Sequence, residues 1–243
     1  MSNTTNYRSL RLSAILLFLG ILISFAAGTY HPDHAPANDH TAAFLEYANE
    51  ATWTATHLGQ FAGMAVLTAG LIVLYSALDL STNKSGWAGR LGLYLVVVSL
   101  ALYAVLQAVD GVALKQAVDA WANAPEAEKA VRFASAEAIR WLEWAVRSYQ
   151  SFVLGLSFLL YAIAITWTAR VPRPIGYLMA ISGLAYLAQG WILGTEGFSE
   201  TNGIPTLLGI LSILGWSLWL LVHAWRMKEI TSSPGSQPKL AQD

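Results

Sequence analysis

The sequence predicts an all-α, polytopic transmembrane bundle of six spans, with the N- and C-termini both cytoplasmic. Three observations support this prediction: an apolar composition, six long uncharged windows, and an uneven distribution of lysine and arginine between the loops. Of the 243 residues, 55% are hydrophobic and only 12% are charged, whereas soluble domains carry about 25% charged residues. A soluble fold of this size would expose large apolar patches, and a bilayer removes that difficulty.

Each predicted span is a window of roughly 20 mostly apolar residues, the length that crosses a bilayer as a helix. None of the windows contains Asp, Glu, Lys or Arg, and the sixth contains one histidine, His223. The six windows are 12–30, 58–78, 91–109, 148–169, 175–195 and 204–225.

Loop charges orient the predicted bundle. Lysine and arginine occur before the first span, between spans two and three, between spans four and five, and after span six. The loops after spans one and five contain acidic residues but no Lys or Arg, and only the loop between spans three and four is mixed. Because positive charge marks cytoplasmic loops, we expect a multi-pass protein of the cell membrane with cytoplasmic termini and an acidic outer surface.

The first span has a second interpretation. Arg8 and Arg11, the apolar run and the small residues up to Gly28 also fit a signal peptide, whose cleavage would leave five spans. The apolar run is long for a signal peptide, which favours an uncleaved membrane anchor.

Helical patterns continue outside the spans. Asp39 is placed to cap an amphipathic helix over 41–55, which we expect along the outer membrane surface. Residues 111–147 are helical in pattern on both sides of Pro125, so spans three and four should project beyond the bilayer and join at a short turn. Residues 1–230 then form one transmembrane domain, and the Ser/Pro/Gln-rich tail 231–243 is predicted to be disordered.

Composition excludes several functions. The net charge of −1 argues against nucleic acid binding, and the absence of cysteine excludes thiolate metal sites and thiol nucleophiles. No residue pattern indicates a cofactor. The expected partners are the lipid bilayer and, through the glycines at 176, 183 and 190 in span five, another helix of the same chain, a membrane partner or a second copy.

Ionisable residues gather at the outer ends of spans two to four. Such groups are costly near lipid and usually face the protein interior. If their faces converge, they enclose a polar chamber in the outer leaflet that is lined by spans two to five. We expect Asp110 and Arg147, the deepest charges, to interact directly or through Glu143. The candidate ligand-binding residues are His57, Gln107, Asp110, Lys115, Glu137, Arg140, Glu143, Arg147 and Gln150.

A second candidate site is the loop after the first span. Three imidazoles and an aspartate that could bind Zn or Cu occur within ten residues, namely His31, Asp33, His34 and His40. Because nothing in the sequence holds these side chains in a fixed geometry, we expect no stoichiometric structural metal in this loop.

Two segments carry a resemblance. The stretch from Val109 to Lys115, VDGVALK, and the stretch from Glu137 to Trp144, EAIRWLEW, are similar to a signature of uncharacterised bacterial six-helix integral membrane proteins. The likeness covers spans two to four. It implies no activity, but it indicates that the polar ends of spans three and four do more than connect the two spans.

Three functions remain open. The chamber can bind a small ligand, the bundle can be a structural or accessory membrane subunit whose ion pairs only hold helices together, or the protein can be a membrane enzyme or outer-loop metal binder. No recognisable catalytic constellation supports an enzyme. The sequence therefore indicates an integral membrane protein of unassigned molecular function, with small-ligand binding in the chamber as the sharper hypothesis.

The predicted topology can be tested by cysteine labelling in intact cells. Ser2→Cys and Ser236→Cys should be protected from a membrane-impermeant reagent because both ends are predicted to be cytoplasmic. Labelling of Ser236→Cys without permeabilisation would contradict this topology.

Overall fold

The computed structural model describes residues 6–32, 34–81 and 86–227, so the predicted tail 231–243 lies outside the described residues. Every regular element in these ranges is helical. Six helices are long and apolar enough to cross a membrane, which confirms a multi-pass membrane protein with six spans. Each predicted window ends within two residues of the corresponding helix or lies inside it.

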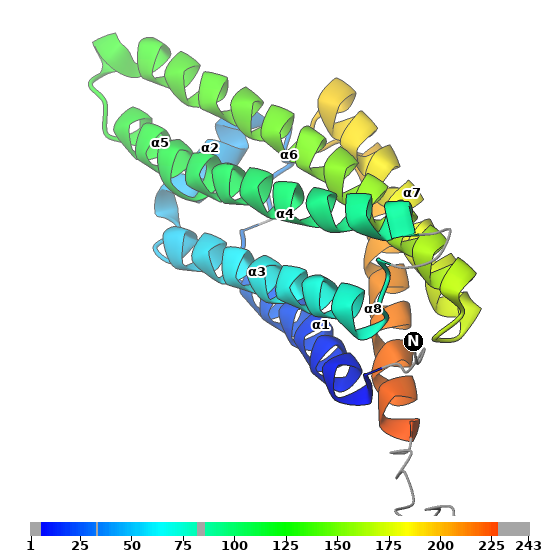
Figure 1. The fold of residues 1–243 in the computed structure, drawn as a ribbon. Coiled ribbons are helices and arrows are strands. Elements are labelled where there is room, and N and C mark those ends of the chain that lie inside the picture. The colour runs from blue at the N-terminus through cyan, green and yellow to red at the C-terminus, as the bar shows by residue number, and fades with distance from the viewer. Residues whose placement is uncertain (1–5, 33, 82–85, 228–243) are drawn as a thin grey trace, which may run out of the picture.

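The elements follow one another with short connections (Figure 1). A π-helix, η1, interrupts the long third membrane helix between α4 and α5, and a single 3-10 turn, η2, precedes α8. The bounds are α1 Tyr7–Gly28, α2 His40–Asn49, α3 Trp53–Ala77, α4 Gly86–Ala108, η1 Val109–Leu114, α5 Lys115–Ala122, α6 Glu126–Thr168, α7 Arg173–Glu196, η2 Glu200–Asn202 and α8 Gly203–Arg226.

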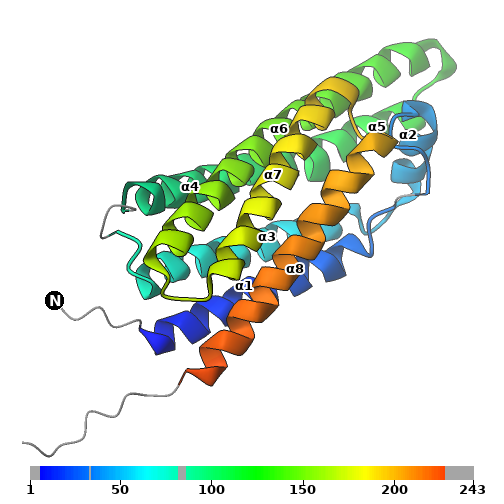
Figure 2. The same ribbon diagram turned by 90° about the vertical axis from the view of Figure 1, so that its right-hand side faces the viewer.

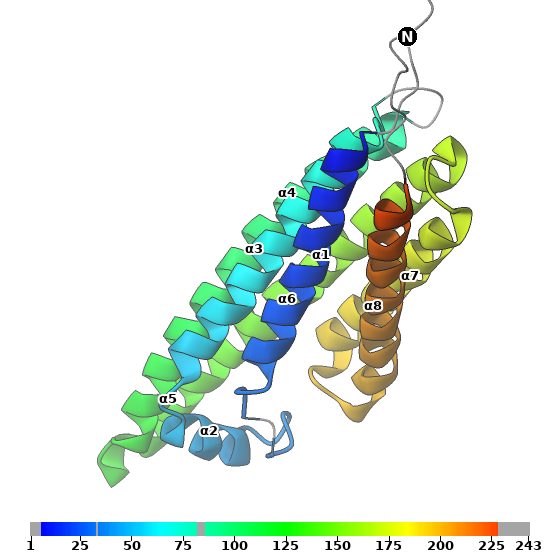
Figure 3. The same ribbon diagram turned by 90° about the horizontal axis from the view of Figure 1, so that it is seen from below.

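The six long helices form a closed ring. Each packs against the next along the chain, in the order α1, α3, α4, α6, α7, α8, and α8 packs back against α1. The start of α1 and the end of α8 lie at the same end of the bundle (Figure 2, Figure 3). Helix α2 and the turn between α5 and α6 lie at the opposite end. The Arg11 side chain closes the ring, because it donates to the carbonyls of Ala224 and Met227 at 3.1 Å each.

Glycines allow the closest helix contacts. A Cβ atom on Gly63 would lie 2.6 Å from the backbone nitrogen of Ser24, so α1 and α3 touch through their backbones. A Cβ on Gly183 would lie 2.8 Å from the carbonyl oxygen of Gly155, and the three predicted glycines of α7 all face α6. The glycine face of α7 is thus covered within the monomer.

Two apolar clusters fill the interior. The larger one lies in the half of the bundle nearer the chain ends and includes Leu71, Phe158 and Trp216, all fully buried. The smaller one lies at the opposite end, where α2 packs on α5 and α6 through Phe44, Trp121 and neighbouring residues. The polar residues of the candidate site lie between these two clusters.

Helix α2 begins where the sequence predicts. Asp39 is its N-cap and accepts a hydrogen bond from the backbone nitrogen of Ala42 at 3.1 Å. The helix ends at Asn49, earlier than expected, and α3 begins at Trp53 with Thr52 as its N-cap residue.

Helix α6 is much longer than a membrane crossing. Its 43 residues correspond to about 65 Å of helix, against a hydrocarbon thickness of about 30 Å. Together with α5 it projects past the ends of the other helices (Figure 1). The predicted turn at Asn123–Pro125 joins the two, since α5 ends at Ala122 and α6 begins at Glu126.

Candidate functional site

A polar chamber of about 250 Å³ lies between the two apolar clusters. Its walls come from the loop after α1, from α2, α3, α4, η1 and α6, and from the connection between α7 and α8. The polar and aromatic residues that line the chamber are His31, Tyr47, Gln60, Gln107, Asp110, Arg140, Glu143, Arg147 and Phe198.

Asp110 lies at the start of the π-helix and lines the chamber together with Gln107, three residues earlier on the same helix face. A π turn adds one residue to the helical turn, which shifts the residues that follow it by about 100° around the axis. Side chains of α3 satisfy the carbonyls in this wide turn: Trp53 Nε1 donates to the Asp110 carbonyl at 2.9 Å, and Thr54 Oγ1 donates to the Gly111 carbonyl at 3.2 Å. Insertions of this kind are frequent at functional sites.

His57 of α3 faces Asp110 of η1 across the interface between these two helices, which the Trp53 and Thr54 hydrogen bonds stabilise. Its Nε2 atom lies 3.0 Å from Asp110 Oδ2, and its Nδ1 atom lies 2.7 Å from the Trp53 carbonyl. The approach needs a glycine, because a Cβ on Gly111 would lie 2.6 Å from the Cβ of His57. Only 2% of the His57 surface is exposed, so this pair is enclosed by protein.

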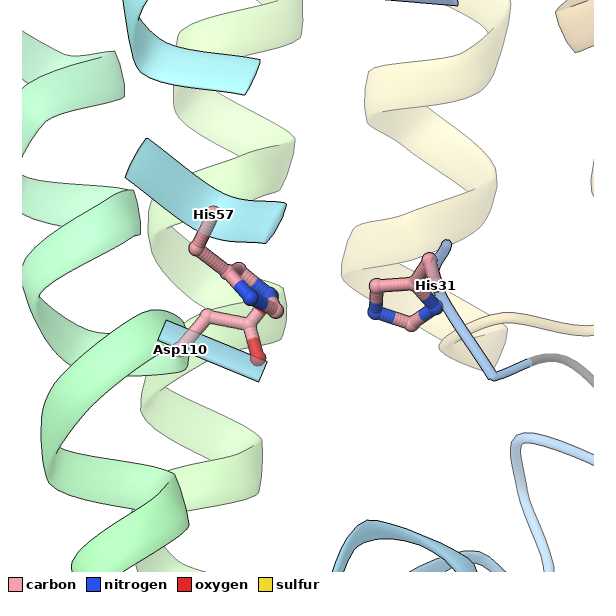
Figure 4. A group of neighbouring side chains, drawn as sticks. All are labelled: His31, His57 and Asp110. Carbon is pink, nitrogen blue, oxygen red and sulfur yellow. The ribbon is translucent and has the colours of Figure 1, made fainter. Parts of the chain in front are cut away.

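His31 approaches the same pair from the loop after α1 (Figure 4). Its backbone nitrogen donates to the Gly28 carbonyl at 3.0 Å, which anchors the loop to the end of the helix. The centres of the His31 and His57 rings are 5.3 Å apart, and the His31 ring lies 5.1 Å from that of Trp53. Three side chains that are distant in sequence therefore meet at one corner of the chamber.

A buried ion pair forms the opposite wall. Arg140 Nη1 donates to Glu143 Oε2 at 2.5 Å, and 3% and 2% of these two residues are exposed. The Arg140 guanidinium also lies over three aromatic rings, those of Tyr47, Trp144 and Phe198, at 5.0–5.9 Å from their centres. The pair links α6 to the loops that cover the chamber.

Arg147 lies one helical turn further into the bundle. Its guanidinium is 5.8 Å from the centre of the Tyr103 ring. No other described residue makes an ion pair or a hydrogen bond with it, although Glu143 is within electrostatic range. The direct form of the expected Asp110–Arg147 interaction is wrong, because Asp110 lies against His57. The expected alternative, an interaction through Glu143, fits the structure better, since Glu143 lies within electrostatic range of both residues.

Several buried polar atoms around the chamber have no hydrogen-bond partner among the described protein groups. Such atoms are uncommon in native proteins, and each needs water, an ion or a ligand. Those on the chamber residues are His57 Nε2, Gln107 Oε1, Asp110 Oδ1, Arg140 Nε and Arg147 Nε. His57 Nε2 is close to Asp110, but the two are not aligned as a hydrogen bond.

Three of the predicted chamber residues lie elsewhere. Lys115 donates to the carbonyls of Tyr47 and Ala48 at 2.9 and 3.1 Å and thereby ties α2 to α5. Glu137 lies 2.9 Å from His40 Nδ1 in a separate open cleft. Gln150 donates to Ser99 Oγ at 3.1 Å deeper in the bundle. All three hold the structure together, whereas the other six form or adjoin the chamber.

The loop histidines do not gather as one group. His34 is exposed and its backbone nitrogen donates to Glu46, while His40 pairs with Glu137. Of the three loop histidines only His31 lines the chamber, and Asp33 lies outside the described residues.

Sequence reasoning missed part of the chamber wall. Tyr47 belongs to the amphipathic pattern of α2, which indicated a buried face but not what it covers. Phe198 lies in the connection between α7 and α8 and had no signal in the sequence. Both residues reach the chamber through tertiary packing alone.

Comparison with protein families gives one match. A model described as a domain of unknown function, DUF4386, matches residues 12–224. The chain belongs to the DUF4386 family. The matched region contains most of every membrane helix and the whole chamber, and the resemblance to an uncharacterised membrane protein family is confirmed at this level.

No curated protein and no solved structure matches the chain. The DUF4386 description assigns no activity. The residues and geometry of the chamber are therefore the basis for a functional proposal.

The buried ion pair gives a prediction about stability. Arg140→Met should lower the free energy of unfolding by about 3–5 kcal/mol because it leaves Glu143 buried and unpaired. The double variant Arg140→Met/Glu143→Leu should lose less than either single change, because no charge is then left without a partner. Unfolding of the detergent-solubilised protein measures these effects.

Arg132 provides the control for this experiment, because it pairs with Glu128 on the exposed surface of the same helix. Arg132→Met should cost about 1 kcal/mol or less. Equal losses for Arg140→Met and Arg132→Met would contradict a buried, paired Arg140.

Proposed function

We propose that this membrane protein binds a small ligand with an anionic group in the chamber, and that Arg147 is the main partner of that group. The proposal rests on Arg147, a half-buried arginine beside the cavity. Its buried Nε has no hydrogen-bond partner, and its guanidinium has no ion partner among the described residues. A partly buried cation that lacks a counter-charge is costly. An anion in the chamber supplies that charge.

The other chamber charges are already matched. Arg140 is neutralised by Glu143, and Asp110 lies against His57. The side-chain amides of Gln60 and Gln107, which lie 3.4 Å apart, add donors and acceptors on the wall formed by α3 and α4. This combination of one charged group and a few neutral polar groups is typical of small-molecule sites.

A structural role explains less. Ion pairs that only hold helices together satisfy both partners, and the Arg140–Glu143 pair fits that description. Arg147 does not, and neither do the buried atoms without partners that gather around the same cavity. Ligand binding accounts for these features together.

The loop charges support an outward-facing chamber. Arg11, Arg90, Arg170 and Arg173 belong to the end of the bundle where α1 begins, and the chamber lies at the opposite end. By the positive-inside rule the first end is cytoplasmic. We therefore propose that the chamber takes its ligand from the outer side of the cell membrane.

Binding of simple anions to the purified protein tests this function. Inorganic phosphate and a phosphatidic acid dispersed in the same detergent are titrated by calorimetry, which separates a free anion from a lipid headgroup. Arg147→Gln should weaken binding of the active probe at least about tenfold, because a hydrogen bond to a charged group contributes about 1.5–3 kcal/mol.

Arg132→Gln is the matched control, since it removes an exposed arginine from the same helix. It should leave the affinity unchanged. Failure of both probes to bind, or equal affinities for Arg147→Gln and the unmodified protein, would show that the chamber is not an anion site.

A further inference from the structure

We infer that His31, His57 and Asp110 form a binding site for a divalent transition-metal ion of the zinc class. Each residue offers one ligand atom, and the three atoms lie within 4.8 Å of one another. They come from the loop after α1, from α3 and from η1, and their side chains point toward a common space (Figure 4). This site uses different residues from the anion partner Arg147.

The donor set and the spacing suit such an ion. Two histidines and one carboxylate are a recurrent ligand set for zinc and for non-haem iron. Ligand atoms bound to zinc at about 2.0–2.1 Å lie roughly 3.0–3.4 Å from each other. His57 Nε2 and Asp110 Oδ2, at 3.0 Å, already have that separation. Only His31, on the loop, needs to move closer.

The hydrogen bonding of His57 presents the required atom. A backbone carbonyl only accepts, so Nδ1 donates its hydrogen to Trp53, and Nε2 faces Asp110. In a neutral imidazole, Nε2 directs a lone pair at the Asp110 carboxylate, and a metal ion between the two atoms satisfies both; without the metal, a protonated His57 forms the ion pair described above. A carbonyl that orients the second ring nitrogen is the usual arrangement around metal-bound histidine.

Two atoms at this corner have no aligned hydrogen bond to any described protein group. They are His57 Nε2 and Asp110 Oδ1, both buried. A metal ion between the ligands would satisfy the nitrogen directly and the carboxylate through one or both oxygens. An ordinary ion pair would leave Asp110 Oδ1 without a partner.

The surrounding structure holds two of the ligands in place. The hydrogen bond from Trp53 to the Asp110 carbonyl positions the π-helix, and Gly111 provides room for His57. His31 is anchored through its backbone to Gly28, but its side chain is on a loop. A preformed pair with a third ligand on a loop leaves a path by which an ion can enter.

The site opens into the chamber. Three protein ligands leave a coordination position for water or substrate, as in catalytic rather than structural zinc sites. His31 and Asp110 both line the chamber wall, opposite Arg140 and Glu143. A bound dication would favour an anion there; this link rests on the proposed function, whereas the metal site does not.

The inference revises the expectation for the histidine-rich loop. The loop contributes one ligand, His31, and the others come from helices that are distant in sequence. His34 is exposed, and His40 is engaged with Glu137. These two histidines therefore serve as controls within the same segment.

Zinc binding to the full-length protein tests the site. The protein is purified without a polyhistidine tag, stripped with a chelator and titrated with Zn²⁺ against a competing indicator dye. Zinc is a suitable probe because it binds such sites more tightly than Mn²⁺ or Fe²⁺. We expect one equivalent. Loss of second-shell partners alone weakens metal affinity 10–100-fold, so His31→Ala and Asp110→Asn should each weaken it at least about tenfold.

His34→Ala and His40→Ala should bind zinc as the unmodified protein does. Absence of stoichiometric zinc binding, or loss of it in His34→Ala with His31→Ala unaffected, would overturn the inference. If Asp110→Asn fails to fold, His31→Ala decides alone, because this loop residue is not part of the apolar clusters. The readout is metal affinity without phosphate or lipid, so its failure leaves the Arg147-dependent anion test standing.

Discussion

Buried charge governs the structure at the end of the bundle where the chamber lies. A membrane helix can expose leucine to lipid at little cost, but an aspartate, glutamate or arginine in such a helix is costly unless it faces the protein interior and is matched. Arg140 and Glu143 match each other within one turn of α6, and Asp110 is matched by His57 across the interface of η1 and α3. The helices around them must therefore separate enough to enclose polar groups, and the separation becomes a chamber. Arg147 remains without a described ion partner.

The rest of the fold makes this enclosure possible. The apolar cluster near the chain ends packs the six helices tightly, with backbone contacts at Gly20 and Gly63 between α1 and α3. At the other end α2 lies across α5 and α6 and closes the chamber from outside. The π-helix lies between these two regions: Asp110 at its start lines the chamber, and the carbonyls of Asp110 and Gly111 accept hydrogen bonds from Trp53 and Thr54. The polar site is thus supported by apolar packing on both sides.

Much of this architecture follows from the sequence. The six spans, the cap at Asp39 and the turn before Glu126 depend on local composition and spacing, and these signals need no tertiary information. The residues of the chamber were partly predictable, because buried charges in membrane helices must face inward. The pairing of these charges was not predictable, because it depends on how the helices are rotated and packed against one another. The sequence grouped His31 with the other histidines of its loop, because its actual neighbours on α3 and η1 are distant in sequence. Lys115, Glu137 and Gln150 were expected at the chamber for a similar reason: their actual partners, which lie elsewhere, cannot be seen in the sequence.

The chamber, on this interpretation, is a ligand-binding site and not only a group of ion pairs that hold the helices together. The most direct measurement is an experimental density map of the protein purified in lipid nanodiscs, at a resolution that distinguishes side chains from bound molecules. The account predicts non-protein density in the chamber that contacts the Arg147 guanidinium. A chamber filled only by ordered water, with Arg147 paired to Glu143 or Asp110, would contradict it.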